Sequence, residues 1–176
     1  MKDALFYEKM KCEGVAVCGL GGLGSHIATA LARAGIGRLH LVDFDKVDAS
    51  NLHRQQYDVT QIGKYKTEAL KESLQKINPE ILIRTDTVRI TEENIEELLG
   101  EETIICEAFD RPEEKAMLVN AVQERYPGTY IVAASGMAGN GPANRIQTRR
   151  VTKHFYLCGD GVSRVEEDEK LISARV

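Results

Sequence analysis

A glycine-rich segment near the start of the chain has the spacing of a phosphate-binding loop. Gly19, Gly21 and Gly24 form the pattern GxGxxG, with Gly22 inside it, between an apolar run and an alanine-rich amphipathic stretch. Where such glycines join a strand to a helix, the backbone can approach phosphates at the helix N-terminus. Asp43 follows about 20 residues later, where an acidic residue can accept hydrogen bonds from ribose hydroxyls. The pattern predicts a nucleotide site; the alternative is a glycine turn that only lets helix and strand pack closely.

The segment after Asp43 carries groups that suit chemistry with ATP. Activation of a carboxylate by ATP builds negative charge on phosphate oxygens, which cations, a polar amide and a metal ion can stabilise. Arg54, Lys66 and Asn51 supply the cations and the amide. A lysine in the first turn of a helix is unfavourable unless an anion is nearby, which favours a phosphate role for Lys66. Both cations could instead be solvated, and Lys64 is the competing lysine.

Asp110 has two interpretations. It follows an apolar run that ends at Cys106, and it precedes Arg111-Pro112. A carboxylate at the end of a strand can hold a metal ion. An aspartate just before a helix that starts with proline is also a favoured N-cap, which contributes about 1 kcal/mol without any catalytic role. The residues themselves leave both possibilities open.

Short β-rich runs alternate with amphipathic helical stretches, which predicts βαβ units and a parallel sheet. We expect an α/β, Rossmann-like, doubly wound and mainly parallel sheet with helices on both faces and a C-terminal β-hairpin extension. In the first helix, Ile27, Ala30, Leu31 and Ala34 are predicted to share the inward face. The predicted strands are 14–18, 38–43, 81–85, 103–106 and 130–134, the helices 23–34, 64–77, 92–99 and 112–126, and the hairpin strands 145–150 and 153–157.

Composition narrows the class of protein. The 176 residues are 43% hydrophobic and 28% charged, which suits one domain over residues 1–176. No apolar run approaches the roughly 20 residues of a membrane helix, and the N-terminus lacks a secretory signal, so we expect a cytoplasmic location. The net charge of −4 without a basic block disfavours nucleic acid as a partner. Residues 171–176 resemble the beginning of an element, so we expect a C-terminally truncated chain.

The cysteines and histidines predict no zinc site. There is no CxxC pair, and Cys18 and Cys106 lie in apolar runs where we expect buried, reduced thiols. Cys158, in a turn-like Cys-Gly-Asp-Gly setting, could form an acyl or persulfide intermediate in sulfur transfer, or be an idle thiol. The four histidines, His26, His40, His53 and His154, lack metal-ligand spacing.

In their order along the chain, these motifs resemble the adenylation family of ThiF, MoeB and the ubiquitin-activating enzymes. The resemblance is carried by DxD at residues 43–45, SNLHRQ at 50–55 and GxxK at 63–66, and it extends from about residue 13 to 160. The short form, with AASG at 133–136 and FYLCGD at 155–160, is most similar to the bacterial branch called thiamine-biosynthesis ThiF family 2.

This resemblance implies an ATP-dependent adenylyltransferase of thiamine biosynthesis. Such an enzyme activates the C-terminal Gly carboxylate of a ubiquitin-like, ThiS-like sulfur-carrier protein ending in Gly-Gly, forms an acyl-adenylate and releases pyrophosphate. The resemblance also implies a homodimer and Mg²⁺ held by Asp110 with Asp45, with Arg54, Lys66 and Asp110 as the catalytic residues. The implied ATP-binding residues are Gly19, Gly21, Gly22, Gly24, Asp43, Asp45, Asn51, Arg54, Gln55 and Lys66.

Two other functions remain open. An NAD(P)-dependent oxidoreductase would explain the glycines and Asp43, because the fingerprint does not separate ATP from dinucleotides. It would assign nothing to Asn51, Arg54, Lys66 or Asp110. A non-catalytic ATP-binding scaffold would bind the nucleotide without performing chemistry on it.

Overall fold

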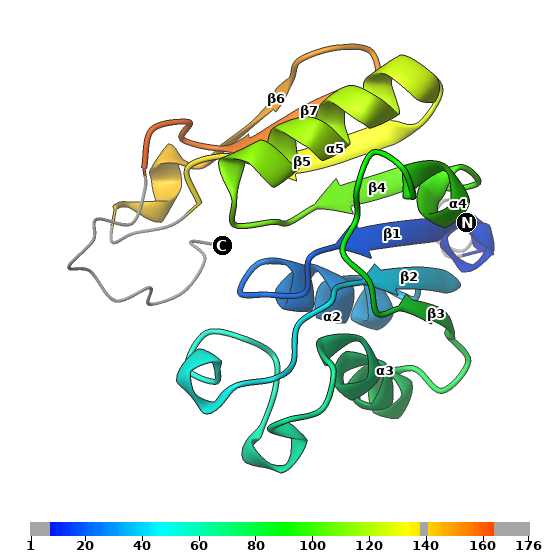
Figure 1. Cartoon of the computed structure of the whole chain (residues 1–176), viewed down its shortest axis with the longest axis vertical. Helices are drawn as coiled ribbons and strands as arrows, with labels where there is room; N and C mark the ends of the chain where they lie inside the picture. The colour runs from blue at the N-terminus through cyan, green and yellow to red at the C-terminus, as the bar shows by residue number, and fades with distance from the viewer. Residues whose placement is uncertain (1–7, 138–140, 164–176) are drawn as a thin grey trace.

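The computed structural model describes residues 8–137 and 141–163, and their strands form one seven-stranded sheet (Figure 1). The strand order is β3-β2-β1-β4-β5-β7-β6, in which every neighbouring pair is parallel except the antiparallel pair of β6 and β7. The strands are β1 (Gly14–Cys18), β2 (Arg38–Val42), β3 (Leu82–Asp86), β4 (Ile104–Glu107), β5 (Tyr130–Ala134), β6 (Gln147–Arg150) and β7 (Phe155–Gly159). The predicted α/β class and mainly parallel sheet are confirmed.

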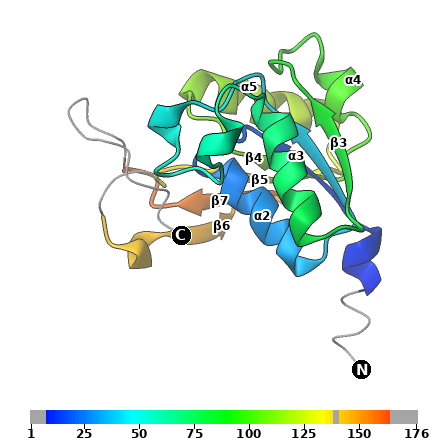
Figure 2. The same cartoon turned by 90° about the horizontal axis from the view of Figure 1, so that it is seen from below.

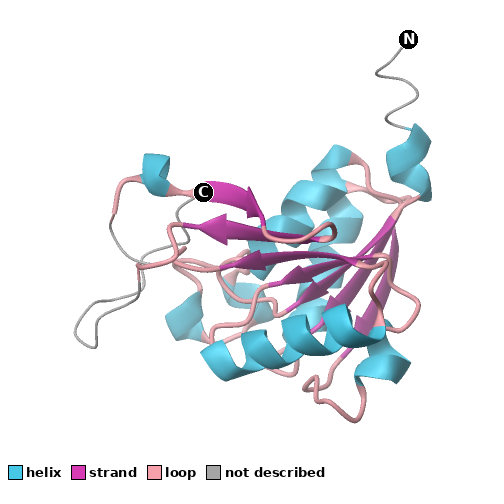
Figure 3. Cartoon of the chain, turned by 90° about the horizontal axis from the view of Figure 1, so that it is seen from above, coloured by secondary structure: helices cyan, strands magenta, loops and turns pink. Residues whose placement is uncertain are grey.

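Helices cover both faces of this sheet (Figures 2 and 3). On one face, α2 (Gly24–Ala34) and α3 (Lys66–Ile77) pack buried side chains against β1 and β2. On the other face, α4 (Ile95–Leu99) and α5 (Pro112–Arg125) pack against β1, β4 and β5. The predicted doubly wound arrangement is therefore confirmed. None of the described helices combines the length and apolar character needed to cross a membrane.

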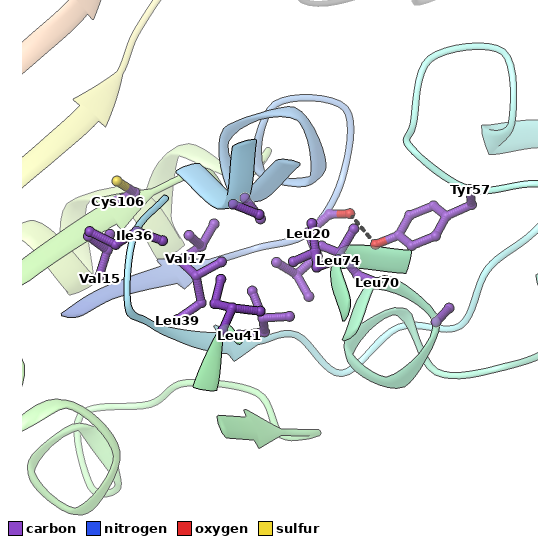
Figure 4. Packing of buried hydrophobic residues seen from close by; sticks show 14 of the residues in the cluster. Val15, Val17, Leu20, Ile36, Leu39, Leu41, Tyr57, Leu70, Leu74 and Cys106 are labelled. Atoms are coloured by element: carbon purple, nitrogen blue, oxygen red, sulfur yellow. Dashed lines mark hydrogen bonds between the residues drawn. The ribbon is translucent and has the colours of Figure 1, made fainter. Parts of the chain in front are cut away.

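The core on the α2 and α3 side reaches the glycine loop (Figure 4). Leu20, which lies in that loop, is completely buried with Leu70 and Leu74 of α3. The Tyr57 hydroxyl donates a hydrogen bond of 2.8 Å to the Leu20 carbonyl oxygen. Burial raises the pKa of Tyr57, so this hydroxyl stays a donor. Core packing thus fixes the glycine loop against the segment that follows β2.

Two details differ from the sequence prediction. In α2 the buried alanines are Ala28 and Ala32, whereas Ala30 and Ala34 are exposed. The helix starts at Gly24 with Ser25 against the sheet, and positions 25, 28 and 32 then share the inward face. The hairpin of β6 and β7 is also part of the main sheet, because β7 pairs in parallel with β5.

The strand order reverses between β1 and β4. Chain connections run outward from β1 toward β3 on one side and from β4 toward β5 on the other. The loops that leave the carboxyl ends of these two strands therefore diverge, and a crevice forms where open α/β sheets bind ligands. The glycine loop follows β1 at this position, and the segment with Asp110 follows β4.

Candidate active site

A cavity of about 970 Å³ lies at the carboxyl ends of the strands, at this switch point. Its wall includes the glycine loop, the segment after β2, the loop between β4 and α5, and residues 134–137. Every predicted site residue except Gly24 lines it: Gly19, Gly21, Gly22, Asp43, Asp45, Asn51, Arg54, Gln55, Lys66 and Asp110. A smaller hollow of about 600 Å³, lined by Arg33 and Arg38, contains none of them.

The glycines of the loop have two separate roles. Gly19 has a φ of +89°, and a Cβ there would also lie 2.9 Å from the Ala108 carbonyl oxygen. Gly24 lies beneath the loop, where a Cβ would overlap with the Gly19 carbonyl oxygen. Gly24 was predicted to bind the nucleotide, but in the structure it serves close packing and does not line the cavity. Gly21 and Gly22 face the cavity with backbone alone, and no side chain caps the N-terminus of α2. A helix N-terminus of this kind suits an anion.

Asp43 joins the glycine loop to the end of β2. Its Oδ2 accepts a hydrogen bond of 2.6 Å from the Leu20 amide, and its Oδ1 accepts one of 2.7 Å from the Asp45 amide. Burial raises the pKa of the Asp43 carboxyl, and the nearby Lys66 ammonium opposes this shift. Asp43 thus holds the loop in place, and each oxygen can still accept a second hydrogen bond from a ligand.

Lys66, and not Lys64, lies at the cavity. Its ammonium group is 2.8 Å from Asp45 Oδ2, and only 5% of the residue is exposed. A bridge between Lys46 and Tyr65 fixes the start of α3, and the Lys66 amide donates to the Asp45 carbonyl oxygen. Lys64 instead forms a half-exposed ion pair with Glu72 outside the cavity.

Three polar side chains of the segment after β2 form a hydrogen-bonded group. The Arg54 guanidinium donates to Asn51 Oδ1 over 2.9 Å, and Gln55 Nε2 donates to the same oxygen over 3.2 Å. Gln55 Oε1 is buried and has no hydrogen-bond partner, the only such side-chain atom in the part of the chain that the structure describes. The half-buried Arg54 is thereby held on the cavity wall.

Asp110 is not a helix cap. Helix α5 begins at Pro112, its N-cap position is Arg111, and no side chain forms a capping hydrogen bond there. The capping interpretation is therefore wrong. The Asp110 carboxylate is exposed and lines the cavity.

The donor set of the cavity fits Mg²⁺ but not a site made by protein ligands alone. Asp45 and Asp110 offer carboxylate oxygens on one cavity, and no donor among residues 8–137 and 141–163 binds Asp45 Oδ1. In residues 8–137 and 141–163, no cluster of three or more His, Cys, Asp or Glu could hold a metal ion. Mg²⁺ is commonly bound through one or two carboxylates together with substrate phosphates and waters. Asp110 and Asp45 could hold it in this way once phosphates are present.

The structure adds residues that the sequence did not single out. Lys115 of α5 lines the cavity and forms an ion pair with the buried Glu107 at the end of β4. At the rim, the Arg89 guanidinium lies 4.2 Å from the centre of the Phe44 ring and forms an ion pair with Glu114. These contacts join residues far apart in sequence, so no local motif could have revealed them.

The described cysteines are all free, and the histidine next to the glycine loop does not face the cavity. Cys18 and Cys106 are buried, as predicted, and burial raises the pKa of the Cys106 thiol to about 11. Cys158 is half-buried, with its sulfur 3.3 Å from Thr148 Oγ1. The His26 ring contacts the Arg54 carbonyl oxygen and the Gln56 side-chain amide.

Thiol reactivity should follow this burial. We expect Cys12 to react first with Ellman's reagent, Cys158 more slowly, and Cys18 and Cys106 only after unfolding, because the thiolate is the nucleophile and buried thiols remain protonated. Absorbance measured with and without denaturant separates these classes. A Cys12→Ser variant should lose the fast phase, and a fast phase of unchanged amplitude in that variant would contradict the assignment.

Comparison with known proteins identifies the family. The model of the ThiF family matches residues 3–173. The chain belongs to the ThiF family. It is 35% identical over 134 residues to the adenylyltransferase and sulfurtransferase UBA4 of Kluyveromyces lactis, an alignment that covers 76% of this chain. The chain spans only 30% of the length of that relative.

Solved structures share the fold of this chain. The E. coli tRNA N6-threonylcarbamoyladenosine dehydratase TcdA in complex with ATP superposes with a TM-score of 0.85 over 96% of this chain and 80% of that chain. At 22% identity, this likeness concerns the fold alone. E. coli MccB with MccA-N7isoASN has a TM-score of 0.67 and 30% identity, over 77% of this chain and 39% of that chain.

Proposed function

We propose that this ThiF-family protein is an ATP-dependent adenylyltransferase that activates the C-terminal carboxylate of a ubiquitin-like carrier protein. One observation carries the proposal: Arg54, Lys66 and Asp110 lie on the same cavity as the glycine loop. The oxidoreductase alternative assigns no specific role to Arg54, Lys66 or Asp110, whereas adenylation uses all three. The name of the relative from Kluyveromyces lactis includes the same activity, which supports the proposal.

The residues of the cavity have separate roles in binding and orienting ATP. The backbone of Gly21 and Gly22 and the N-terminus of α2 receive phosphate oxygens, while Arg54 donates its planar fork of hydrogen bonds to them. The Lys66 ammonium, which lies beside Asp45, neutralises negative charge on the phosphates. Bound at Asp110 and Asp45, Mg²⁺ would stabilise the charge of the phosphates. A carboxylate oxygen of the carrier then attacks the α-phosphorus, the bond to the bridging oxygen breaks, and pyrophosphate leaves with that electron pair.

The identity of the carrier belongs to the same proposal. The sequence resemblance favours a ThiS-like sulfur carrier with a C-terminal Gly-Gly, acting in thiamine biosynthesis in the cytoplasm. Pathway, location and the expected homodimer stay predictions.

ATP–pyrophosphate exchange tests the proposal directly. With a full-length preparation and a ThiS-like carrier, we expect radioactive pyrophosphate to enter ATP only when carrier and Mg²⁺ are both present. A carrier without its final glycine is the matched control, because it lacks the attacking carboxylate in the correct position. Saturable NADH binding without competition from ATP would support the oxidoreductase instead, and ATP binding without exchange would support the scaffold.

A further inference from the structure

A buried ion pair holds the loop that carries Asp110. Glu107 ends β4 and is only 1% exposed, and Lys115 lies in the first turns of α5. The Lys115 ammonium donates to both Glu107 oxygens, over 2.9 and 3.0 Å. It also donates to the Phe109 carbonyl oxygen over 2.7 Å, while the Phe109 amide donates to Glu107 Oε1 over 2.7 Å. Both main-chain polar groups of the residue before Asp110 are therefore held by this pair.

The hydrogen bonds of Lys115 separate it from the cations proposed to bind phosphate. A lysine ammonium has three donors, and the three contacts to Glu107 and Phe109 use all of them. Lys115 lines the cavity with a quarter of its side chain exposed, yet it has no N–H left for a ligand. By contrast, the Arg54 guanidinium has five donors and is held by few partners.

Stability alone does not account for such a pair. Burying two charges costs about as much as their attraction returns, and a hydrophobic pair of similar volume is often equally stable. The ion pair also orients the main chain, because its hydrogen bonds fix the Phe109 peptide groups and connect α5 to the end of β4. The peptide that follows leads directly to Asp110.

We infer that Glu107 and Lys115 are positioning residues that fix the direction in which Asp110 points into the cavity. For the role of Asp110 as a metal-holding carboxylate, this inference rests on the proposed function. The two side chains touch neither substrate nor metal; they act through the main chain of Phe109.

A double variant, Glu107→Leu with Lys115→Met, removes the ion pair and its hydrogen bonds to Phe109, and it leaves no unpaired buried charge. The matched control is Lys64→Met, because Lys64 also contacts both oxygens of a glutamate, Glu72, but outside the cavity. We expect both variants to melt cooperatively. Lys115→Arg should retain the wild-type response, because its guanidinium can still bridge Glu107 and Phe109.

Two measurements give the result. The first is calorimetric ATP binding at a series of Mg²⁺ concentrations and in EDTA. We expect the double variant to keep the ATP affinity measured in EDTA, while its apparent Mg²⁺ affinity falls by about 10–100-fold, the usual effect of losing groups that orient a metal ligand. The second is hydrogen–deuterium exchange, in which the peptide containing Phe109 and Asp110 should exchange faster in the double variant than in the wild type or Lys64→Met.

Each outcome decides one question. An unchanged Mg²⁺ response in the double variant, or an equal loss of ATP affinity with and without Mg²⁺, would overturn the positioning role. If the wild type binds no ATP at all, the proposed function fails, and hydrogen–deuterium exchange alone tests the positioning role. Faster hydrogen–deuterium exchange in the double variant, confined to the Asp110 loop, supports that role. Unchanged hydrogen–deuterium exchange overturns it.

Discussion

Replacement of Arg54 by alanine is expected to lower carrier-dependent ATP–pyrophosphate exchange by roughly 100-fold or more, with little change in thermal stability. Removal of one preorganised donor from a site of developing charge typically costs about 10²–10³-fold in rate. Arg54 lies half-buried on the cavity wall, where, among the residues that the structure describes, its guanidinium contacts Asn51 Oδ1 and, over a longer distance, the Ser50 carbonyl oxygen. These surface contacts contribute little to folding, so the loss should be seen in ATP binding and exchange.

Calorimetry with ATP·Mg²⁺ and, separately, with NADH measures this prediction without any carrier. The matched control is Arg33→Ala, which removes an arginine from the smaller hollow and should leave ATP binding unchanged. Arg54→Lys keeps the charge but not the planar fork, and it should recover only part of the affinity. ATP affinity that is equal in Arg54→Ala and wild type would show that the phosphates do not lie at this guanidinium.

The fold could be predicted because its determinants are local and repeated. Each β-rich run is followed by an amphipathic stretch, and strand pairing then follows from the connection rules of α/β proteins. On the inward face of α2, Ile27 and Leu31 were predicted correctly, whereas Ala30 and Ala34 were not. Alanines occupy positions 28, 30, 32 and 34, so periodicity alone does not decide which of them face inward. The contact of Ser25 with the Gly21 carbonyl oxygen at the helix start decides between them.

The candidate site could be predicted only where its residues lie in one motif. Arg54 and Lys66 were predicted because SNLHRQ and GxxK resemble motifs of a known adenylation family, and because their charges suit phosphate binding. Glu107 and Lys115 were missed, since the pair joins the end of a strand to a helix across an intervening loop, and neither residue type is unusual at its position. The burial of Glu107 that makes this pair informative is a property of the packed sheet.

Replacement of Gly24 by alanine is expected to destabilise the protein by up to about 2 kcal/mol and to lower its ATP affinity. In a helix, alanine is favoured over glycine by up to about 1 kcal/mol. Here the new Cβ would overlap with the Gly19 carbonyl oxygen and would also lie 3.2 Å from the Ala108 Cβ. Gly19 cannot yield easily, because its φ is +89° and its amide donates to the Val42 carbonyl oxygen over 2.9 Å. The cost of overpacking, about 1–3 kcal/mol or more, should therefore exceed the gain in helix propensity.

Thermal melting and ATP titration measure the two consequences of Gly24→Ala together. For a chain of this size, a loss of 2 kcal/mol lowers the melting temperature by about 4–8 °C. Gly128→Ala is the control: Gly128 is exposed, a Cβ there would have no neighbour within 4 Å, and the change should stay within about 0.5 kcal/mol. Because Gly24 packs directly beneath the loop whose backbone lines the cavity, a stable variant with reduced ATP affinity would still support this geometry. If the variant equalled wild type in both stability and ATP affinity, α2 and the glycine loop could separate without consequence. The close approach of Gly24 to Gly19 would then have no role in holding the site.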